Sequence, residues 1–335
     1  MYSRVFKRSA ATTASSTRLT IRERVWTDSP TVRRLFDTNV SSASYTAFAL
    51  TRDLPDSFGS ALVEHYNHGE NKEETVSISL AKSQHEDYVR AIREFGDIPT
   101  LSLPPAHDLA DSVFVEDTAI VIRHNDATKA LLLQPGHESR QPEVNDIRKV
   151  LQKILPRENI WEMADLDPYA RCDGGDVMYT GRHLFVGVSE RTNEEAVEVL
   201  ENVFTKTNGT TQSPLPLIPV VLPPHAPVLH LKSAVTHMDA HTLVAPTAPW
   251  ASHLLRSMRV SALGYDVIRI PDVLACNLVA LPCHRRILLQ DTPCEESREL
   301  LEQAARKRNM TWQWVNTAEL AKKDAALTCC SILLP

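Results

Sequence analysis

Residues 118–162 read TAIVIRHNDATKALLLQPGHESRQPEVNDIRKVLQKILPRENIWE, and this stretch holds one complete strand, strand, helix, strand unit. Aliphatic and β-branched runs predict strands at Thr118–Arg123, Ala130–Leu133 and Asn159–Glu162. Before the last of these, apolar residues three and four apart predict a helix over Glu143–Ile154. The stretch therefore predicts an α/β fold built from units of this kind.

The same alternation continues in both directions from this unit, starting at about residue 45. Further strands are predicted at Tyr45–Leu50, Thr100–Leu103, Val177–Tyr179, Leu184–Val188, Val228–Leu231, Thr242–Val244, Asp266–Arg269, Leu278–Pro282, Arg286–Leu289 and Ile332–Leu334. Further helices are predicted at Ser83–Phe95, Asn193–Phe204, Pro249–Met258 and Glu295–Lys307. Several units of the same order indicate a repeated α/β module. The proline-rich stretch Pro214–Pro227 is interpreted as a loop inside one domain.

The composition is that of an ordinary globular protein. The 335 residues are 43% hydrophobic, which is enough for a large core, and no run of 18 apolar residues predicts a membrane span. A net charge of -6 predicts no general attraction to nucleic acid or to an anionic membrane. The six cysteines include no C-x-x-C pair, so they indicate a reducing compartment rather than a disulfide scaffold or structural zinc.

The first 22 residues differ from the rest of the chain. Basic residues stand among many Ser and Thr, and the first acidic residue is Glu23; the basic residues are Arg4, Lys7, Arg8, Arg18 and Arg22. This profile is typical of a mitochondrial transit peptide, and a basic tail on a cytoplasmic protein is the alternative. We expect residues 1–44 to form an extension and residues 45–335 to form a single catalytic domain.

Two adjacent cysteines, Cys329 and Cys330, lie in the apolar run Leu327–Pro335. A thiol is a strong nucleophile, although a free cysteine is more often buried and inert. If the run is a strand, alternation places Cys330 on the same face as Ile332 and places Cys329 on the same face as Ser331. This predicts that Cys330 packs in the core and that Cys329 is the reactive thiol.

Three further groups of residues suggest chemistry. Two adjacent glycines flanked by acids, at Asp173–Asp176, predict a close backbone approach in a chain with only ten glycines. If Asp111–Asp117 is a strand, alternation places Asp117 and Glu116 on opposite faces. Carboxylates beside apolar strand residues suggest a buried site for a cation. His230 follows an apolar approach and is a candidate acid and base.

Other histidines raise the question of a zinc site. His237 and His241 are four residues apart, a spacing that suits a metal on a helix, and His225 is nearby. This stretch has no helical periodicity, so we expect surface histidines and no metal site. Any zinc that bound would act as an inhibitor by capturing the Cys329 thiolate.

Five blocks of sequence, in the same order, resemble the dimethylarginine dimethylaminohydrolase family. The blocks are Val113–Ala119, Asp173–Val177, Phe185–Asn193, His230–Ser233 and Leu327–Ser331. The resemblance implies a five-bladed α/β propeller of ββαβ modules around a pseudo-five-fold axis. It also implies hydrolysis of asymmetric dimethylarginine and monomethylarginine to citrulline and dimethylamine or methylamine, with no cofactor.

The resemblance assigns a role to individual residues. Cys329 matches the nucleophile that forms an S-alkylthiouronium intermediate, His230 matches the general acid and base, and Asp173 matches the group that orients His230. The positions that match substrate-binding residues are Asp111, Glu116, Asp117, Arg140, Arg191, Val63 and Lys323. Among these, Asp117 is expected to bond the guanidinium and the two arginines to neutralise the α-carboxylate. A lid is expected near Leu54–Val63.

The alternatives are a deiminase of the same superfamily, acting on arginine or agmatine, and a catalytically silent relative that binds a partner. In the deiminases the catalytic histidine is the first residue of a His-x-Asp motif. In this chain the residue at the position of that Asp, two after His230, is Lys232. A silent relative would usually have lost Cys329, His230 or Asp173, and this chain has all three. Gln134 and the stretch Ala234–His241 depart from the family pattern, so monomethylarginine could be preferred over dimethylarginine. We also expect a bound guanidinium to promote ionisation of the Cys329 thiol.

Overall fold

The fold is assembled from five three-stranded sheets in the part of the chain that the structure describes. The computed structural model describes residues 48–63, 75–124, 127–205, 214–223, 226–281 and 285–334. These residues belong to one compact unit, Ser41–Pro335. The expected extension at residues 1–44 lies outside the described residues.

Each sheet contains three short strands. The sheets are β15 (Ile332–Leu334), β1 (Phe48–Arg52) and β2 (Thr100–Leu103); β3 (Ala119–His124), β4 (Ala127–Leu132) and β5 (Ile160–Glu162); β6 (Val177–Tyr179), β7 (Leu184–Val188) and β8 (Leu217–Val221); β9 (Thr236–Asp239), β10 (Thr242–Pro246) and β11 (Asp266–Ile270); and β12 (Leu278–Leu281), β13 (Arg286–Gln290) and β14 (Thr311–Val315). In every sheet the middle strand is antiparallel to the first strand and parallel to the third. The five sheets are therefore copies of one module.

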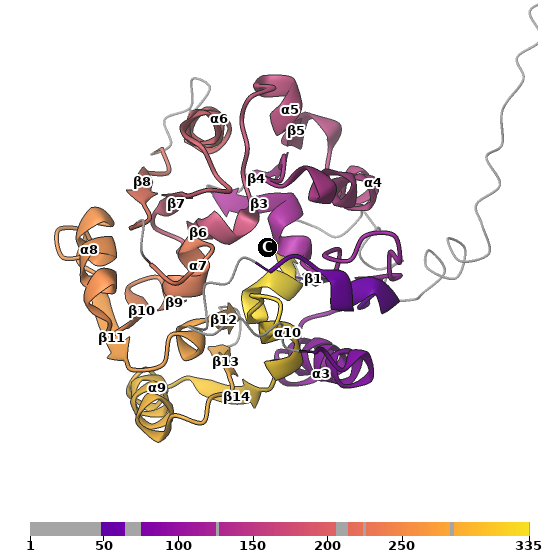
Figure 1. Ribbon diagram of the computed structural model, residues 1–335. Coiled ribbons are helices and arrows are strands. Elements are labelled where there is room, and N and C mark those ends of the chain that lie inside the picture. Colours follow the sequence, from indigo (N-terminus) through magenta and orange to yellow (C-terminus); the bar gives the residue numbers. More distant parts are fainter. Residues whose placement is uncertain are drawn as a thin grey trace, which may run out of the picture. The chain divides into compact units, whose positions relative to one another are not determined.

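One long helix connects the two parallel strands of each module, as a parallel pair requires. These helices are α3 (Ile78–Arg90), α4 (Val144–Ile154), α6 (Glu194–Phe204), α8 (Pro249–Ser257) and α9 (Glu295–Lys307). They lie on the outside of a ring, and the first strand of each module lies toward the centre (Figure 1). The predicted ββαβ propeller is confirmed.

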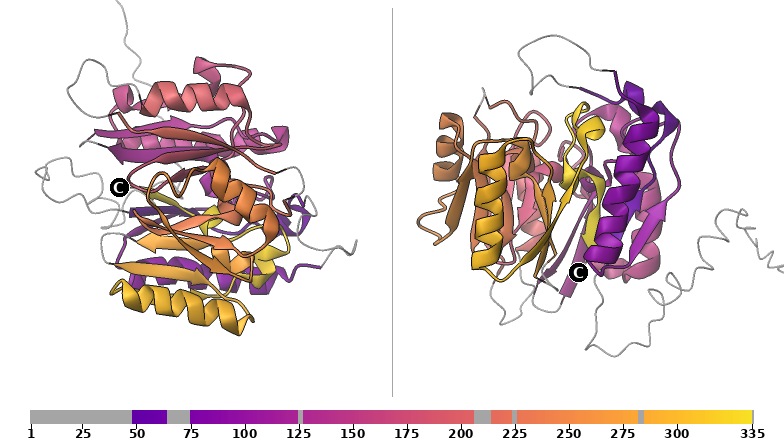
Figure 2. Two further views of the ribbon diagram at one scale, coloured as in Figure 1. Left: turned by 90° about the vertical axis from the view of Figure 1, so that its left-hand side faces the viewer. Right: turned by 90° about the horizontal axis from the view of Figure 1, so that it is seen from below.

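The last strand of the chain completes the first module. β15 is antiparallel to β1, with Leu50 opposite Ile332 and Phe48 opposite Leu334. Figure 2 shows the yellow end of the chain beside the indigo elements, which come from its beginning. This pairing holds the segment just before β15, which contains both adjacent cysteines, among the inner parts of the modules.

The five long helices and most strands were predicted correctly, although α3 begins five residues before the predicted Ser83. The Val228–Leu231 strand is wrong. This run is an irregular segment that leads into the short helix α7 (Leu231–Ala234). Val228 and Leu231 are apolar because they pack into a buried cluster with Phe185. Burial alone made the run resemble a strand.

Three strands were missed: β8, β9 and β14. β8 lies inside Pro214–Pro227, so the interpretation of that stretch as a loop is wrong. Pro219 is tolerated there because β8 pairs only with β7 and forms the edge of its sheet. β9 and β14 contain several polar residues, which weakened the signal in the sequence.

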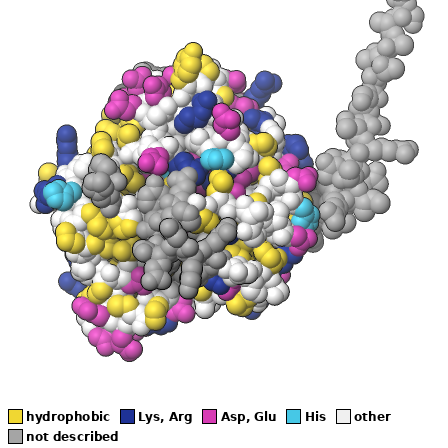
Figure 3. All heavy atoms as spheres, in the orientation of Figure 1, with side chains coloured by type: hydrophobic (Ala, Val, Ile, Leu, Met, Phe, Trp, Pro, Cys, Tyr) yellow, Lys and Arg dark blue, Asp and Glu magenta, His cyan; other side chains and the backbone are white. Residues whose placement is uncertain are grey.

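The described surface mixes charges of both signs. Acidic and basic side chains are interspersed over the face in Figure 3. Among the described residues, no helix is both long enough and apolar enough to cross a membrane.

Candidate active site

Side chains from six separate parts of the chain meet at one small pocket. Its lining consists of Leu62, Asp111, Phe114, Asp117, Arg140, Arg191, Leu229, His230, Lys323, Asp324, Ala325 and Cys329. Seven of the ten predicted site residues are in this lining, and the other three are Asp173, Glu116 and Val63. The fold therefore gathers a thiol, an imidazole, carboxylates and cationic side chains in one place.

The two cysteines lie in a 3-10 turn, Leu327–Cys330, and not in the strand expected from their apolar surroundings. β15 begins only at Ile332, so strand alternation is not the reason why the two thiols differ. Cys329 lines the pocket, whereas Cys330 is fully buried in the adjoining apolar core. The predicted contrast between the thiols is present, but a turn produces it.

Burial is the main factor that raises the pKa of the Cys329 thiol, and the nearby Glu116 and Asp117 carboxylates raise it further, to about 12. The thiol is therefore protonated at neutral pH in the free protein. A cation placed in the pocket would oppose the carboxylates and lower this pKa.

His230 directly precedes the short helix α7, and it is 4% exposed. Its Nε2 lies 3.1 Å from Oδ2 of Asp173, which is fully buried and accepts a 2.8 Å hydrogen bond from the Gly136 N–H at Oδ1. Burial lowers the pKa of His230, but Asp117 and other carboxylates, with the Asp173 hydrogen bond, outweigh it and raise the pKa to about 9. The imidazole is thus held in place and charged at neutral pH.

The two glycines after Asp173 are needed because other groups approach their backbone. A Cβ on Gly175 would lie 2.5 Å from Nδ1 of His230, and one on Gly174 would lie 1.9 Å from the carbonyl oxygen of Glu116. Real Cβ atoms do not approach heavy atoms so closely. The glycine pair lets the imidazole and the acidic segment pack directly against this turn.

Asp176, the last residue of the same motif, joins two loops of the site. Its Oδ1 accepts from the Leu231 N–H at 2.9 Å, and its Oδ2 accepts from the hydroxyls of Ser189 at 2.6 Å and Thr192 at 2.7 Å. The first contact holds the backbone after His230, and the other two hold the loop that carries Arg191. Sequence reasoning did not assign Asp176 to the site, although its place in the motif was a signal.

Asp117 is a buried carboxylate whose two oxygens both accept hydrogen bonds in the pocket. Its Oδ1 accepts from the Gly175 N–H at 2.8 Å, and its Oδ2 accepts from Nη1 of Arg140 at 2.7 Å. Burial raises the pKa of Asp117, but Arg140 and His230 outweigh it and hold the pKa at about 2.

The segment Asp111–Asp117 was expected to be a strand. It forms turns and a 3-10 helix, Val115–Thr118, so the argument from alternating strand faces does not apply.

Arg191 and Lys323 add positive charge to the pocket lining, and both are about 5% exposed. The Nη1 of Arg191 lies 3.8 Å from Oδ2 of Asp173. Asp111 faces the same space, and burial raises its pKa, an effect that Arg140 opposes.

The segment expected to form a lid ends beside this pocket. The N–H of Leu62 donates to Oδ1 of Asp111 at 3.1 Å, and Leu62 itself lines the pocket. Val63, the predicted contact, is half-buried and is not among the lining residues. Residues 64–74 lie outside the described range.

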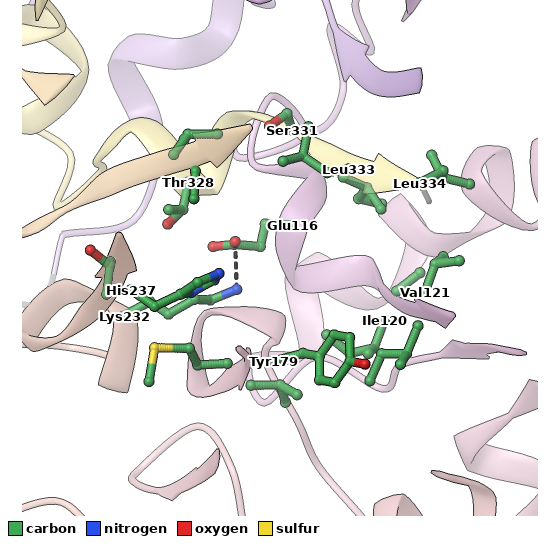
Figure 4. A pocket seen from close by; sticks show the side chains of 18 of the residues that line it. Glu116, Ile120, Val121, Tyr179, Lys232, His237, Thr328, Ser331, Leu333 and Leu334 are labelled. Atoms are coloured by element: carbon green, nitrogen blue, oxygen red, sulfur yellow. Dashed lines mark hydrogen bonds and ion pairs between the residues drawn. The ribbon is translucent and has the colours of Figure 1, made fainter. Parts of the chain in front are cut away.

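Glu116 faces a second cavity of about 330 Å³, which is lined by the inner strands of the modules and is here called the central cavity. There its Oε1 accepts from Nζ of Lys232 at 2.5 Å, and Figure 4 shows the pair beside His237 and Thr328. The cavity wall away from this pair is mainly apolar (Figure 4). Glu116 was predicted to contact the substrate, but the structure does not place it in the lining of the Cys329 pocket.

Asp117 and His230 from the pocket lining, and Asp173 behind it, have potential metal ligand atoms within 4.8 Å of one another. The carboxylate oxygens already accept hydrogen bonds from backbone N–H groups and from Arg140. The cluster therefore suits acid–base chemistry better than metal binding.

The other histidines differ in their surroundings. His241 is exposed, as expected, but His237 is half-buried and lines the central cavity, so the prediction of a surface position is wrong for it. Burial lowers the pKa of His237 to about 4, which keeps it neutral. His225 lies outside the described residues.

The chain is similar to known proteins over most of its length. A family model described as arginine deiminase matches residues 72–259. The chain is 30% identical over 287 residues to the N(G),N(G)-dimethylarginine dimethylaminohydrolase of Streptomyces coelicolor, covering 85% of this chain and 96% of that protein. It is 30% identical over 298 residues to the human protein named putative hydrolase DDAH2, covering 85% of this chain and 93% of the relative.

Solved structures show the same fold. A Pseudomonas aeruginosa dimethylarginine dimethylaminohydrolase, solved in complex with citrulline, superposes with a TM-score of 0.70 at 23% identity. The match covers 87% of this chain and 100% of that one.

Proposed function

Because this chain belongs to the dimethylarginine dimethylaminohydrolase family, whose members are hydrolases of guanidino C–N bonds, we propose that it converts N-ω-methylated arginines to citrulline. The substrates are asymmetric dimethylarginine and monomethylarginine, and the second product is dimethylamine or methylamine. The observation that carries the proposal is the pocket itself, in which Cys329 and His230 lie with an ionised Asp117.

The distribution of charge in the pocket suits a guanidinium amino acid. Asp117 supplies a buried negative charge for the guanidinium, and Asp111 supplies a second carboxyl group for the α-amino group of the substrate. Arg191 and Lys323 supply positive charge for the α-carboxylate. Arg140 also lines the pocket, but its Nη1 is directed at Asp117. This support is electrostatic, and it favours a substrate that carries an α-carboxylate over agmatine.

The first half of the reaction forms a covalent bond to the enzyme. The guanidinium lowers the pKa of the Cys329 thiol, the thiol releases its proton to solvent, and the thiolate attacks the guanidinium carbon. The bond from that carbon to the methylated nitrogen then breaks, and His230, which is charged at neutral pH, donates a proton to the departing amine. An S-alkylthiouronium and a neutral His230 remain.

The second half consumes one water molecule. Neutral His230 accepts a proton from the water as its oxygen bonds to the same carbon. The C–S bond then breaks with the electron pair going to sulfur, and the second proton of the water passes from the new oxygen to the sulfur, which leaves citrulline and restores the Cys329 thiol. Asp173, at 3.1 Å from Nε2, keeps the imidazole oriented and stabilises its charged form in both halves.

Lys232 separates this proposal from the deiminase alternative. It occupies the place of the second carboxylate that clamps an unsubstituted guanidinium in the deiminases, and it is paired with Glu116 in the central cavity. A site without that second clamp leaves the methylated nitrogen unconstrained. The presence of Cys329, His230 and Asp173 together argues against a silent relative.

The direct test compares four substrates with the purified protein: asymmetric dimethylarginine, monomethylarginine, arginine and agmatine. Citrulline and carbamoylputrescine are measured. Citrulline from the methylated substrates should disappear in Cys329→Ser and persist in Cys330→Ser, a matched control one residue away. Fastest turnover of arginine or agmatine would refute the proposal.

The sequence of the first 22 residues supports a mitochondrial or a cytoplasmic location. Fusion of residues 1–44 to a fluorescent reporter distinguishes them, because only a transit peptide carries the reporter into mitochondria.

A further inference from the structure

Arg140 is held by a buried acid that no prediction assigned to the site. Glu143 lies three residues later and is 3% exposed. Its Oε1 accepts from Nε of Arg140 at 3.3 Å, and its Oε2 accepts from Nη2 at 2.9 Å. Two parallel hydrogen bonds of this kind fix the plane of a guanidinium as well as its position.

These two hydrogen bonds from Arg140 to Glu143, here called the fork, determine which edge of the Arg140 guanidinium faces the pocket. Of the five N–H bonds of a guanidinium, Glu143 takes two, the carbonyl oxygen of Phe114 takes one at 3.1 Å, and Oδ2 of Asp117 takes one at 2.7 Å. The Nη1 edge is therefore the one aimed at Asp117. Asp117 also accepts from the N–H of Gly175, a residue where an added Cβ would meet the His230 ring, so Arg140 is linked through Asp117 to the turn beside the imidazole.

We propose that Glu143 is a positioning residue that aims Arg140 at Asp117 and so places the carboxylate that receives the substrate guanidinium. It acts through Arg140 and does not line the pocket. The inference rests on the proposed function, since it concerns the binding of the same substrate. Replacement of Glu143 by a neutral side chain leaves a buried guanidinium with a weaker partner and frees it to turn away from Asp117.

Glu143 also makes the arrangement sensitive to pH. Burial raises its pKa to about 7, and Arg140 opposes this effect while Asp111 and Asp117 add to it. These three are the charged groups that face it from its own segment and from the acidic segment. As pH falls through 7, Glu143 becomes protonated and holds Arg140 less strongly.

The chain offers a matched control on the same module. Glu162 accepts the same pair of hydrogen bonds from Arg148. Nε of Arg148 donates to Oε1 of Glu162 at 2.8 Å, and Nη2 donates to Oε2 at 2.9 Å. This pair is about 31% exposed and lies outside the pocket lining. Glu162→Gln therefore removes the same kind of interaction without touching the site.

The test measures kcat and KM for asymmetric dimethylarginine in the wild type, Glu143→Gln, Glu143→Asp and Glu162→Gln. Glu143→Gln should raise KM by about tenfold or more with kcat changed by less than about threefold, and Glu162→Gln should match the wild type. Glu143→Asp keeps the charge on a shorter side chain, so its KM should lie between those of the wild type and Glu143→Gln. Kinetics of Glu143→Gln that equal those of Glu162→Gln would overturn the proposal.

Two further readouts complete the test. The wild type should lose kcat/KM as pH falls through about 7, and Glu143→Gln should lack this decline; the same decline in both would count against Glu143. If Glu143→Gln fails to fold, Glu143→Asp decides, and an unchanged KM in that variant overturns the proposal.

Failure of the proposed function is recognised separately, by a wild type that forms no citrulline. In that case a crystal structure of Glu143→Gln, or of Glu143→Asp, tests the positioning role without catalysis. Loss of the contact between Nη1 of Arg140 and Asp117 supports the role, and retention of that contact overturns it.

Discussion

Asn277 and Thr328 exchange two hydrogen bonds: the Thr328 N–H donates to Oδ1 of Asn277 at 3.0 Å, and Nδ2 of Asn277 donates to the Thr328 hydroxyl at 3.0 Å. The same Nδ2 donates to the carbonyl oxygen of Lys232 at 3.1 Å. Asn277 thus connects the turn that carries Cys329 with the segment that follows His230. It is 1% exposed and directly precedes the inner strand β12, so it positions both groups from a rigid element.

Asn277→Asp should lower kcat by about 10- to 100-fold with little change in KM. The aspartate keeps the shape of the side chain, but it has no N–H to donate to Thr328 or Lys232, so the two catalytic segments lose their common anchor. Steady-state kinetics check the prediction, and exposed Asn145→Asp on α4 is the control. A fall confined to KM would contradict this role for Asn277.

Gly175→Ala should lower kcat by about 100-fold, because the new Cβ would have to lie 2.5 Å from Nδ1 of His230 and would displace the imidazole. Gly59→Ala is the matched control, since its Cβ would meet its nearest neighbour, Ile78, at 3.7 Å, an ordinary contact. Assays of citrulline formation compare the two variants after circular dichroism has shown both to be folded. Equal activity in the two would show that the imidazole tolerates the methyl group.

The Cys329 thiol should ionise at lower pH when a guanidinium is bound. Its pKa of about 12 in the free protein reflects burial and nearby carboxylates, and a cation opposes the carboxylates. Thiolate absorbance at 240 nm, taken as the difference between wild type and Cys329→Ser, should appear below pH 10 with arginine. Citrulline, which has the same backbone without the charge, is the control. Identical titrations with both ligands would argue against activation by substrate.

The charge on His230 should make stability depend on pH. Its pKa is raised from 6.5 to about 9, so its contribution to the free energy of unfolding is fully present below pH 6.5 and is lost as pH rises through about 9. The loss amounts to about 3 kcal/mol for a shift of this size. Urea unfolding at pH 6 and pH 9.5 measures it in the wild type and in His230→Gln.

The variant should lack this decline, and exposed His241→Gln should retain it. Parallel stability curves for the wild type and His230→Gln would mean that the carboxylates around the imidazole do not favour its charged form.

The order of strands and helices could be predicted from local patterns because each element buries one face, and its apolar residues repeat with the period of that element. The unit at residues 118–162 shows this directly. The Val228–Leu231 run shows the limit: apolar residues packed in an irregular segment have the same local appearance as a strand.

Short sequence blocks that resemble the family were enough to single out Cys329, His230 and Asp173, and the structure places Cys329 and His230 in one pocket, with Asp173 3.1 Å from the imidazole. The amino-acid sequence did not reveal the fork between Glu143 and Arg140, the anchor at Asn277, or the turn that separates Cys329 from Cys330. A buried charge or amide must find a partner, but which partner depends on segments that are far apart in the chain and meet only when the ring closes. Pairing of β15 with β1 closes that ring, and with it the pocket takes its form.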